Sequence, residues 1–230
     1  MTGGGGARGP RIVVLSAPSG GGKTTIAKAV RERYPDRFGF SVSATTRKPR
    51  AGEREGVDYY FWDKDHFARE IAAGKFLEHA EYAGERYGTL KSEVEKIRKT
   101  GRHVLLDIEV QGAEQISRLE PEALRLFVLP TSPEVWFERL LGRQSESAVE
   151  IRRRLETAVE ELKKAAHFQR IITNDALDAA VGEVVRAADE GGYEGNQGRI
   201  QESLALFSEY NRFVSHKMQQ LNREIHSGKG

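Results

Sequence analysis

The sequence predicts an α/β fold in which a mainly parallel sheet is covered by helices on both faces. Short apolar runs typical of buried strands alternate along the chain with amphipathic helical stretches, which is the pattern of a parallel sheet. A glycine-rich loop joins the first apolar run to the first helical stretch. The length of 230 residues suits one such domain, either alone or with an appendage.

Four apolar runs are expected to form the strands, at 12–17, 103–110, 124–130 and 170–174. Helices are expected at 24–34, 64–74, 91–100, 111–119, 132–142, 147–166 and 175–190. The segment 38–62 differs, because its short polar and aromatic runs are interrupted by turn-rich residues. It predicts a small, partly antiparallel insert that could hold a second substrate over the glycine-rich loop.

Composition narrows the class of protein and its partners. The formal net charge is +2 with 30% charged residues, a near balance that argues against nucleic acid as the main partner. The absence of cysteine excludes disulfides and thiolate zinc sites. No apolar stretch approaches the roughly 18–20 residues of a membrane span, and the glycine-rich residues 1–10 read as a disordered tail rather than a secretory signal. We therefore expect a cytoplasmic protein without a membrane partner.

Residues 12–25, IVVLSAPSGGGKTT, predict a phosphate-binding loop (P-loop) between a strand and a helix. The glycines let backbone N–H groups surround a phosphate, and Lys23 adds a point charge at the outer phosphates. The Thr24 hydroxyl can ligate Mg²⁺, and the following helix directs its positive end toward the anion. Ala17 stands where the strict pattern has glycine. The alternative is a glycine-rich turn with an unrelated lysine, which the flanking strand and helix disfavour.

The densest polar group follows the first strand and helix, and comprises Ser43, Thr45, Thr46, Arg47, Arg50, Tyr59 and Tyr60. Arg47 and Arg50 are three residues apart with Pro49 stiffening the turn between them, which predicts a bidentate anion clamp. Tyrosine hydroxyls can complete a phosphate shell. Each arginine alone could equally be a solvated surface charge.

Three carboxylates are candidates for recognising a base or a metal. Glu78 lies in FLEHAEYAGERYGT, and a carboxylate can accept from the N1–H and the exocyclic amino group of guanine, a donor pair that adenine lacks. Asp107 and Glu109 are expected to end a buried strand at the sheet edge where ligands bind. There Asp107 could hold Mg²⁺ through water, and Glu109 could be a second acceptor for the base. The alternatives are a surface acid for Glu78 and helix-capping or loop acids for the other two.

The motifs APSGGGKTT, FGFSVSATTRKPRAGE, DYYF, FLEHAEYAGERYGT and LDIEVQGA, in this order and spacing, resemble the guanylate kinase family. The likeness runs from about residue 11 to about residue 187, and Ala17 fits the family's form of the loop. It implies a guanylate kinase domain at 11–190 with the P-loop NTPase fold, a GMP-binding insert at 38–90 and a lid at 139–155. It also implies Mg²⁺-dependent phosphoryl transfer from ATP to GMP, giving ADP and GDP.

The resemblance assigns roles to individual residues. The ATP-binding set it implies is Ala17, Pro18, Ser19, Gly20, Gly21, Gly22, Lys23, Thr24, Thr25 and Asn174, the last near the adenine. The GMP-binding set is Arg47, Arg50, Tyr59 and Tyr87 for the phosphate, and Ser43, Glu78, Thr89 and Glu109 for the guanine. The catalytic charges are Lys23, Arg47 and the lid arginines Arg139, Arg143 and Arg154. Thr24 and, through water, Asp107 match the metal positions.

Two other functions remain open at this point. Guanylate-kinase-like domains also serve as non-catalytic phosphopeptide-binding modules, but the intact Lys23 and Thr24 and the lid arginines favour an enzyme. A P-loop kinase of a phosphorylated sugar would have no need of the guanine-reading residues. One departure from the family pattern is Gln144, which stands where a glycine usually follows the lid arginine.

The last segment, 191–230, departs in composition from the rest of the chain. The glycine-rich GGYEGNQG predicts a linker. One long amphipathic helix is expected at 199–226, because apolar residues recur there at three- and four-residue steps, namely Ile200, Leu204, Phe207, Val214, Met218, Leu221 and Ile225. This apolar stripe either packs back on its own domain or mediates homo-oligomer formation.

Overall fold

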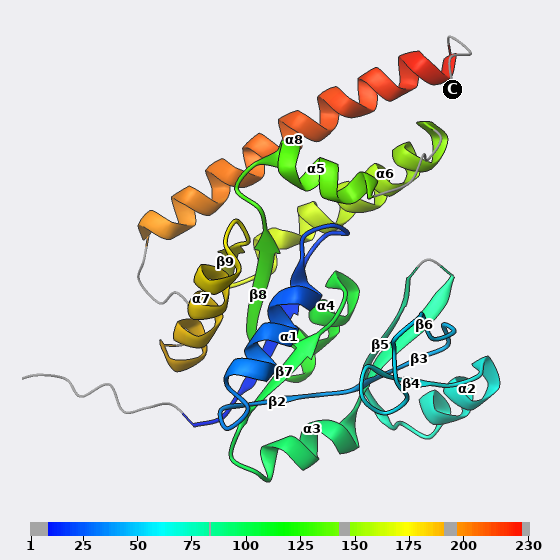
Figure 1. Cartoon of the computed structure of the whole chain (residues 1–230), viewed down its shortest axis with the longest axis vertical. Coiled ribbons are helices and arrows are strands. Elements are labelled where there is room, and N and C mark those ends of the chain that lie inside the picture. The colour runs from blue at the N-terminus through cyan, green and yellow to red at the C-terminus, as the bar shows by residue number, and fades with distance from the viewer. Residues whose placement is uncertain (1–8, 83, 143–147, 191–196, 227–230) are drawn as a thin grey trace, which may run out of the picture.

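The computed structural model describes residues 9–82, 84–142, 148–190 and 197–226 (Figure 1). Its centre is a five-stranded sheet in the order β2-β7-β1-β8-β9, in which every neighbouring pair is parallel. The strands are β1 Ile12–Ser16, β2 Phe38–Phe40, β7 His103–Asp107, β8 Leu124–Leu129 and β9 Arg170–Thr173. The predicted parallel α/β fold is therefore confirmed.

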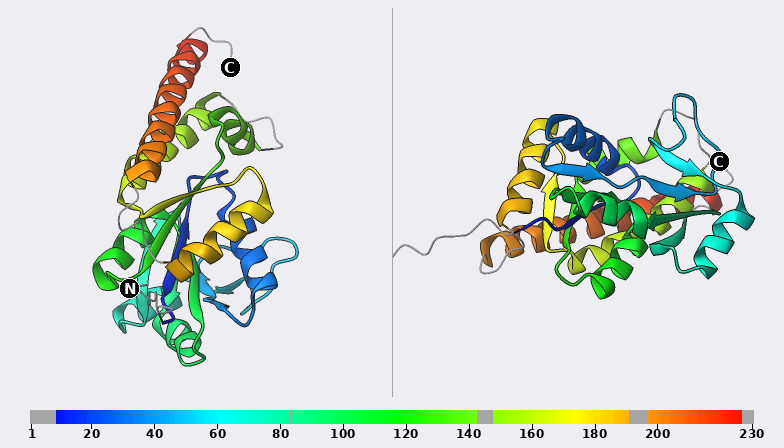
Figure 2. Two further views of the ribbon diagram at one scale, coloured as in Figure 1. Left: turned by 90° about the vertical axis from the view of Figure 1, so that its left-hand side faces the viewer. Right: turned by 90° about the horizontal axis from the view of Figure 1, so that it is seen from below.

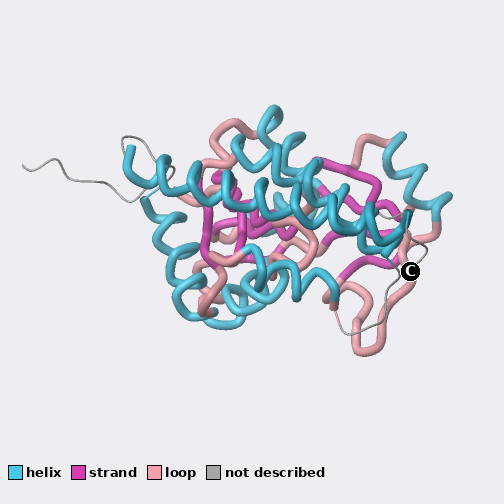
Figure 3. Tube along the Cα trace, turned by 90° about the horizontal axis from the view of Figure 1, so that it is seen from above, coloured by secondary structure: helices cyan, strands magenta, loops and turns pink. Residues whose placement is uncertain are grey.

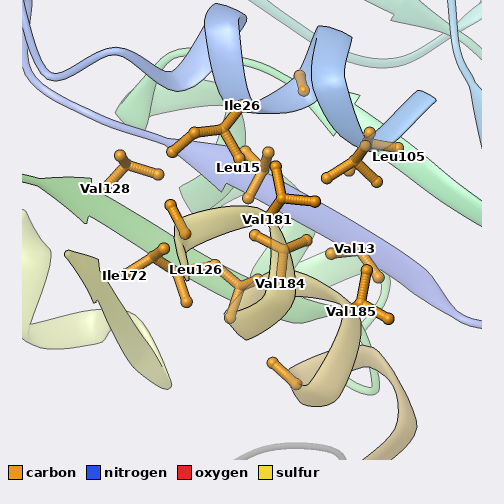
Figure 4. Close-up of a cluster of buried hydrophobic side chains, with 14 of the residues drawn as sticks. Val13, Leu15, Ile26, Leu105, Leu126, Val128, Ile172, Val181, Val184 and Val185 are labelled. Carbon is orange, nitrogen blue, oxygen red and sulfur yellow. The ribbon is translucent and has the colours of Figure 1, made fainter. Parts of the chain in front are cut away.

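Alternate side chains of β1 are buried on opposite faces of this sheet, as a strand covered on both sides requires. Val13 and Leu15 pack with Ile26 of α1 and Val181 of α7 (Figure 4). Ile12 packs on the other face, against the helices that carry the connections to β7 and β8. The helices are α1 Lys23–Arg33 and α7 Leu177–Glu190 on one face, and α3 Lys91–Arg98 and α4 Val110–Leu119 on the other.

A second, four-stranded sheet in the order β4-β3-β6-β5 lies to one side of the first (Figure 2). Its strands are β3 Ser43–Thr45, β4 Tyr59–Phe61, β5 Phe76–Tyr82 and β6 Glu85–Leu90. The β3–β4 pair is parallel and the other two pairs are antiparallel. The insert is therefore partly antiparallel, but its antiparallel pairs depend on β6 and β5 at 76–90, which lie outside the segment 38–62 and were not predicted as strands. Helix α2, Lys64–Ala72, stacks Phe67 on Phe76 of this sheet.

The structure corrects two boundaries of the sequence prediction. The segment 38–62 is not all insert, because β2 pairs with β7 at the edge of the main sheet and Phe38 is buried in the main core. The strand predicted at 103–110 ends at Asp107, and Glu109 instead occupies the N-cap position of α4. In both cases the apolar pattern correctly predicted an extended chain. Where each strand ends and which strand it pairs with depend on residues distant in sequence.

The C-terminal helix α8, Gln197–His226, packs on α5, Pro133–Leu141, and α6, Ala148–Lys164, which a 3₁₀ turn at Ala165–His167 continues (Figure 3). Val214 and Leu221 of the predicted stripe, together with Tyr210, which was not predicted, are buried in one cluster with side chains of both helices. The Tyr210 hydroxyl donates to the Pro130 carbonyl oxygen at 2.7 Å. The stripe therefore packs on its own domain, the first of the two alternatives.

Several predictions made from the sequence lie outside the described residues. These are the tail apart from residues 9 and 10, most of the linker, the side chains of Ile200 and Leu204, and the lid residues 143–147 with Arg143 and Gln144. Within the ranges that the structure describes, no helix has both the length and the apolarity needed to cross a membrane.

Candidate active site

The P-loop joins the end of β1 to the start of α1. Gly20 and Gly22 have φ of +82° and +91°, a left-handed conformation that side chains rarely adopt. Asn174, just after β9, donates from Nδ2 to the Gly21 carbonyl oxygen at 2.9 Å. A Cβ at Gly22 would lie 2.0 Å from that amide nitrogen. Asn174, which the resemblance places near the adenine, thus holds the loop backbone in this structure.

Lys23, the first residue of α1, is held between two carboxylates. Its Nζ lies 3.0 Å from Asp107 Oδ1 and 3.0 Å from Glu109 Oε1. Burial alone would lower the pKa of Lys23, but the two negative charges outweigh it and hold the pKa well above its ordinary value. The ammonium group is therefore charged at neutral pH, and the sheet edge brings together the predicted Lys23, Asp107 and Glu109. Thr24 and Thr25 are exposed in the first turn of the same helix.

Ser19 anchors the loop to the helices of the predicted lid region. Trp136 of α5 donates from Nε1 to the Ser19 carbonyl oxygen at 3.0 Å, and the Ser19 N–H points to Glu161 Oε2 of α6 at 3.4 Å. Burial, with the charge of Glu109 adding to it, raises the pKa of Glu161 to about 8. Sequence reasoning missed Trp136 and Glu161, because nothing local marks residues more than a hundred positions away as partners of Ser19.

Four of the predicted GMP-binding residues form a row across the second sheet. In strand register Tyr59 of β4 lies beside Ser43 of β3, Ser43 beside Thr89 of β6, and Thr89 beside Glu78 of β5. Tyr87 is two residues from Thr89 and therefore shares its face. Residues separated by up to 46 positions are thus brought to one surface, as the resemblance implies.

Glu78 is only 3% exposed at the end of this row. Its Oε1 accepts hydrogen bonds from Thr89 N at 2.9 Å and from Thr89 Oγ1 at 2.6 Å. Burial raises the pKa of Glu78 to about 7, the Thr89 hydrogen bonds oppose the rise, and the charge of Glu109 adds to it. A buried carboxylate with this environment is not the surface acid of the alternative interpretation.

Gly112 of α4 makes room for this carboxylate and was not singled out from the sequence. A Cβ at position 112 would lie 2.3 Å from Glu78 Oε2 and 2.9 Å from its Cδ. No side chain fits there while Glu78 keeps its hydrogen bonds to Thr89. The glycine stands in LDIEVQGA, and the reason for it is visible only once α4 is placed against β5.

Arg47, half of the predicted anion clamp, is paired with a carboxylate of the chain itself. Its guanidinium makes two 2.9 Å hydrogen bonds to the carboxylate of Glu53 and lies 5.4 Å from the centre of the Tyr59 ring. Glu53 also accepts from the Arg50 backbone N–H at 2.7 Å, and the Arg50 side chain is exposed. Tyr87 packs edge-on to Tyr59 with ring centres 6.1 Å apart. Glu53 was missed, although it stands three residues after Arg50 in TTRKPRAGE.

The two halves of the site face each other. Burial is the main cause of the raised pKa of Tyr59, the negative charge of Asp107 adds to it, and the positive charge of Lys23 opposes it. The Tyr59 hydroxyl therefore lies within electrostatic range of the P-loop ion pair. Glu109 similarly acts on both Lys23 and Glu78. Glu109, which pairs with Lys23, is the N-cap of α4, and α4 packs on β5, which carries Glu78, so the second sheet approaches the P-loop there.

Two of the three predicted lid arginines, Arg139 and Arg154, lie in the part of the chain that the structure describes. Arg139, near the end of α5, is exposed and donates from Nη1 to the Asn174 carbonyl oxygen at 3.2 Å, which places it beside the P-loop. Arg154 lies on α6 and is half-buried. The segment that joins these helices includes Arg143, outside the described residues.

Comparison of the sequence with known proteins points to one family. A sequence model of the guanylate kinase family matches residues 9–190. A guanylate kinase from Synechocystis sp. is 48% identical over 180 residues, 78% of this chain and 94% of that protein. The human guanylate kinase is 42% identical over 185 residues, 79% of this chain and 94% of that protein.

Solved structures point the same way. The crystal structure of a guanylate kinase from Anaplasma phagocytophilum is similar with a TM-score of 0.65 and 28% identity, covering 88% of this chain and 98% of that one. Together with the family match over most of the chain, these likenesses show that the protein belongs to the guanylate kinase family.

Proposed function

We propose that this protein transfers the γ-phosphoryl group of ATP to the phosphate of GMP, giving ADP and GDP. The observation that carries the proposal is the buried Glu78 carboxylate, in register with Thr89 and Ser43 on a sheet that borders the P-loop. An ionised Glu78 accepts from the two guanine donors, and Thr89 and Ser43 add hydroxyl groups for the remaining base edge. Arg47, Arg50, Tyr59 and Tyr87 then hold the GMP phosphate.

The chemistry needs charge and positioning rather than a general base. The attacking atom is a GMP phosphate oxygen that is already ionised at neutral pH, so a new O–P bond forms while the bond to ADP breaks and ADP leaves with its electron pair. Two unit negative charges 4 Å apart repel by about 4 kcal/mol at an effective dielectric near 20. Lys23, Arg47, Arg50, Arg139 and Arg154 supply the positive charge that offsets this repulsion.

In this mechanism the GMP phosphate replaces the Glu53 carboxylate as a partner of the Arg47 guanidinium. Glu53 occupies the guanidinium fork with two hydrogen bonds of 2.9 Å, the geometry that a phosphate would take. The fork is therefore oriented before substrate arrives, and the phosphate displaces Glu53 from at least one of its nitrogens. Closure of the lid at 139–155 over both substrates then excludes the water that would hydrolyse ATP.

The donor set near Lys23 fits Mg²⁺. The Thr24 hydroxyl and the Asp107 carboxylate are hard oxygen ligands of the kind this ion prefers, and Asp107 would act through water. Within the described ranges no group of three or more His, Cys, Asp or Glu side chains is arranged to hold a metal. When bound, Mg²⁺ neutralises charge on the transferring phosphates.

We assign the catalytic domain to residues 11–190, with the GMP-binding insert beginning at β3 rather than at residue 38. In the 191–230 extension, α8 serves as a helix that covers α5 and α6. The buried Val214 and Leu221 of its stripe are not available for association between copies of the chain. Light scattering of the full chain measures whether a homo-oligomer forms.

An ADP-release assay with GMP, AMP, CMP and UMP as acceptors tests the activity. We expect turnover with GMP far above that with the other three. ADP release with a phosphorylated sugar alone would support the sugar kinase. Phosphopeptide binding with no turnover on any nucleotide would support the non-catalytic module. Either result would overturn the proposal.

A further inference from the structure

A cavity of about 290 Å³ lies between α4, β8 and the end of α6, on the face of the main sheet opposite α1. None of the residues assigned to ATP, GMP or the metal lines it. Its polar wall consists of Glu114 and Arg118 from α4, Arg125 from β8 and Lys164 and His167 from the end of α6, and Val110 and Phe168 make its apolar wall.

Arg125 is the unusual member of this wall. It stands in the apolar strand β8, and its Nε is inaccessible to solvent and has no hydrogen-bond partner. Within the described residues its side chain makes one long hydrogen bond, from Nη1 to the Ala123 carbonyl oxygen at 3.4 Å, and no ion pair. Burial lowers its pKa and no neighbouring charge opposes this effect. A half-buried guanidinium without a counter-ion is unfavourable, and an anion in the cavity would remove that cost.

The carboxylate in the cavity cannot serve as that counter-ion. Glu114 is already paired through Oε1 with Arg118 Nη2 at 2.6 Å and through Oε2 with Lys164 Nζ at 3.1 Å. Three cations and one carboxylate leave the cavity wall with two net positive charges when His167 is neutral. The positive charges come from three elements, α4, β8 and α6, and all three line the cavity, so they do not form a stripe along one helix.

We propose that this cavity is an anion site for a phosphate group, free or carried by a small phosphate monoester. The guanidinium groups of Arg125 and Arg118 and the ammonium of Lys164 would take the phosphate oxygens. The apolar wall formed by Val110 and Phe168 suits the organic part of a monoester. The volume is at the small end of ligand pockets, which excludes large ligands.

The position of the cavity couples it to the P-loop. Val110 directly follows Glu109, which pairs with Lys23, and Lys164 is one turn beyond Glu161, which faces the Ser19 N–H. An anion that draws Lys164 and Arg118 from Glu114 would break the ion pair between Lys164 Nζ and Glu114 Oε2, which links α6 to α4. Phosphate binding and ATP binding are therefore linked, and by thermodynamic reciprocity each alters the affinity for the other.

Calorimetry with the full chain saturated with GMP and a non-hydrolysable ATP analogue tests the site, because the substrate phosphate positions, including that of the γ-phosphate, are then filled. The probes are inorganic phosphate and glycerol 3-phosphate. We expect binding to be weakened by about tenfold or more in Arg125→Gln and in Arg118→Gln. The matched control is Arg69→Gln on α2, which removes the same charge from an exposed position and should bind like the unaltered chain.

Equal affinity in all four proteins, or no binding at millimolar probe, would overturn the site. If Arg125→Gln does not fold, the affinity of Arg118→Gln for the probes tests the site, because Arg118 is exposed and its substitution should not prevent folding. Tighter binding of glycerol 3-phosphate than of phosphate identifies a monoester as the ligand, and the reverse order identifies free phosphate. The KM for ATP should shift with phosphate in the unaltered chain and in Arg69→Gln but not in Arg125→Gln; an unchanged KM in every protein would refute the coupling.

Discussion

The buried carboxylate of Glu78 makes stability depend on pH in a direction that can be worked out from the structure. Burial raises its pKa from an ordinary value of 4.5 to about 7. Below pH 4.5 Glu78 is protonated in both the folded and the unfolded chain, so it does not change the free energy of unfolding. Above it the unfolded chain ionises first, so the folded state loses stability until the pH passes about 7. A shift of about 2.5 units corresponds to about 3 kcal/mol.

The substitution Glu78→Gln removes this penalty and keeps an oxygen acceptor for Thr89. The free energy of unfolding of the variant, relative to the unaltered chain, should therefore rise by about 3 kcal/mol between about pH 4 and about pH 8. Urea unfolding at a series of pH values, followed by tryptophan fluorescence, measures this difference. Glu81→Gln, at an exposed position on the same strand, is the matched control.

The same carboxylate links pH to substrate recognition. GMP binds the ionised form, so the KM for GMP should rise about tenfold per pH unit below about 7, while Glu78→Gln should show a flat profile and a weaker preference for GMP over AMP. A stability difference that does not change with pH would refute the burial argument. Unchanged selectivity in the variant would show that the base is read elsewhere.

Three further changes test other parts of the site. Lys23→Ala should reduce kcat by a factor of about 100 or more with a small effect on the KM for GMP, and normal turnover would exclude the P-loop assignment. Gly112→Ala should displace Glu78 and raise the KM for GMP with little change for ATP, measured by initial rates; equal effects on both substrates would point to general misfolding. Truncation after Glu190, the last residue of α7, removes α8 and exposes the surface that buries Tyr210, Val214 and Leu221, which should lower the unfolding free energy by several kcal/mol in urea denaturation. An unchanged midpoint would mean that α8 does not cover this core in solution.

The P-loop could be read from the sequence because its determinants are contiguous. The apolar strand, the glycines with positive φ and Lys23 lie within 12–25, and each acts on its neighbours in the chain. The helices and the core strands follow from local periodicity for the same reason. Even the long C-terminal helix could be predicted, because a repeating apolar stripe is a property of one segment.

The row of Tyr59, Ser43, Thr89 and Glu78 could be expected only from the resemblance to a family. Its members come from β4, β3, β6 and β5, and what joins them is strand register between segments that no local pattern specifies. Three other features also depend on how the chain folds rather than on local sequence. They are the pairing of β2 with β7, the contact of Glu53 with Arg47, and the space that Gly112 leaves for Glu78.

The sequence by itself determined the helices, most strands of the main sheet and the glycine-rich loop, and the resemblance to a family supplied the candidate GMP-binding residues. Tertiary structure alone decided which of them meet. It placed Lys23 between Asp107 and Glu109, buried Glu78 so that its pKa rises, covered the α8 stripe with α5 and α6, and left Arg125 without a counter-ion among the described residues. Burial and charge pairing depend on surfaces that come together only when distant segments pack, so residue order alone does not specify them.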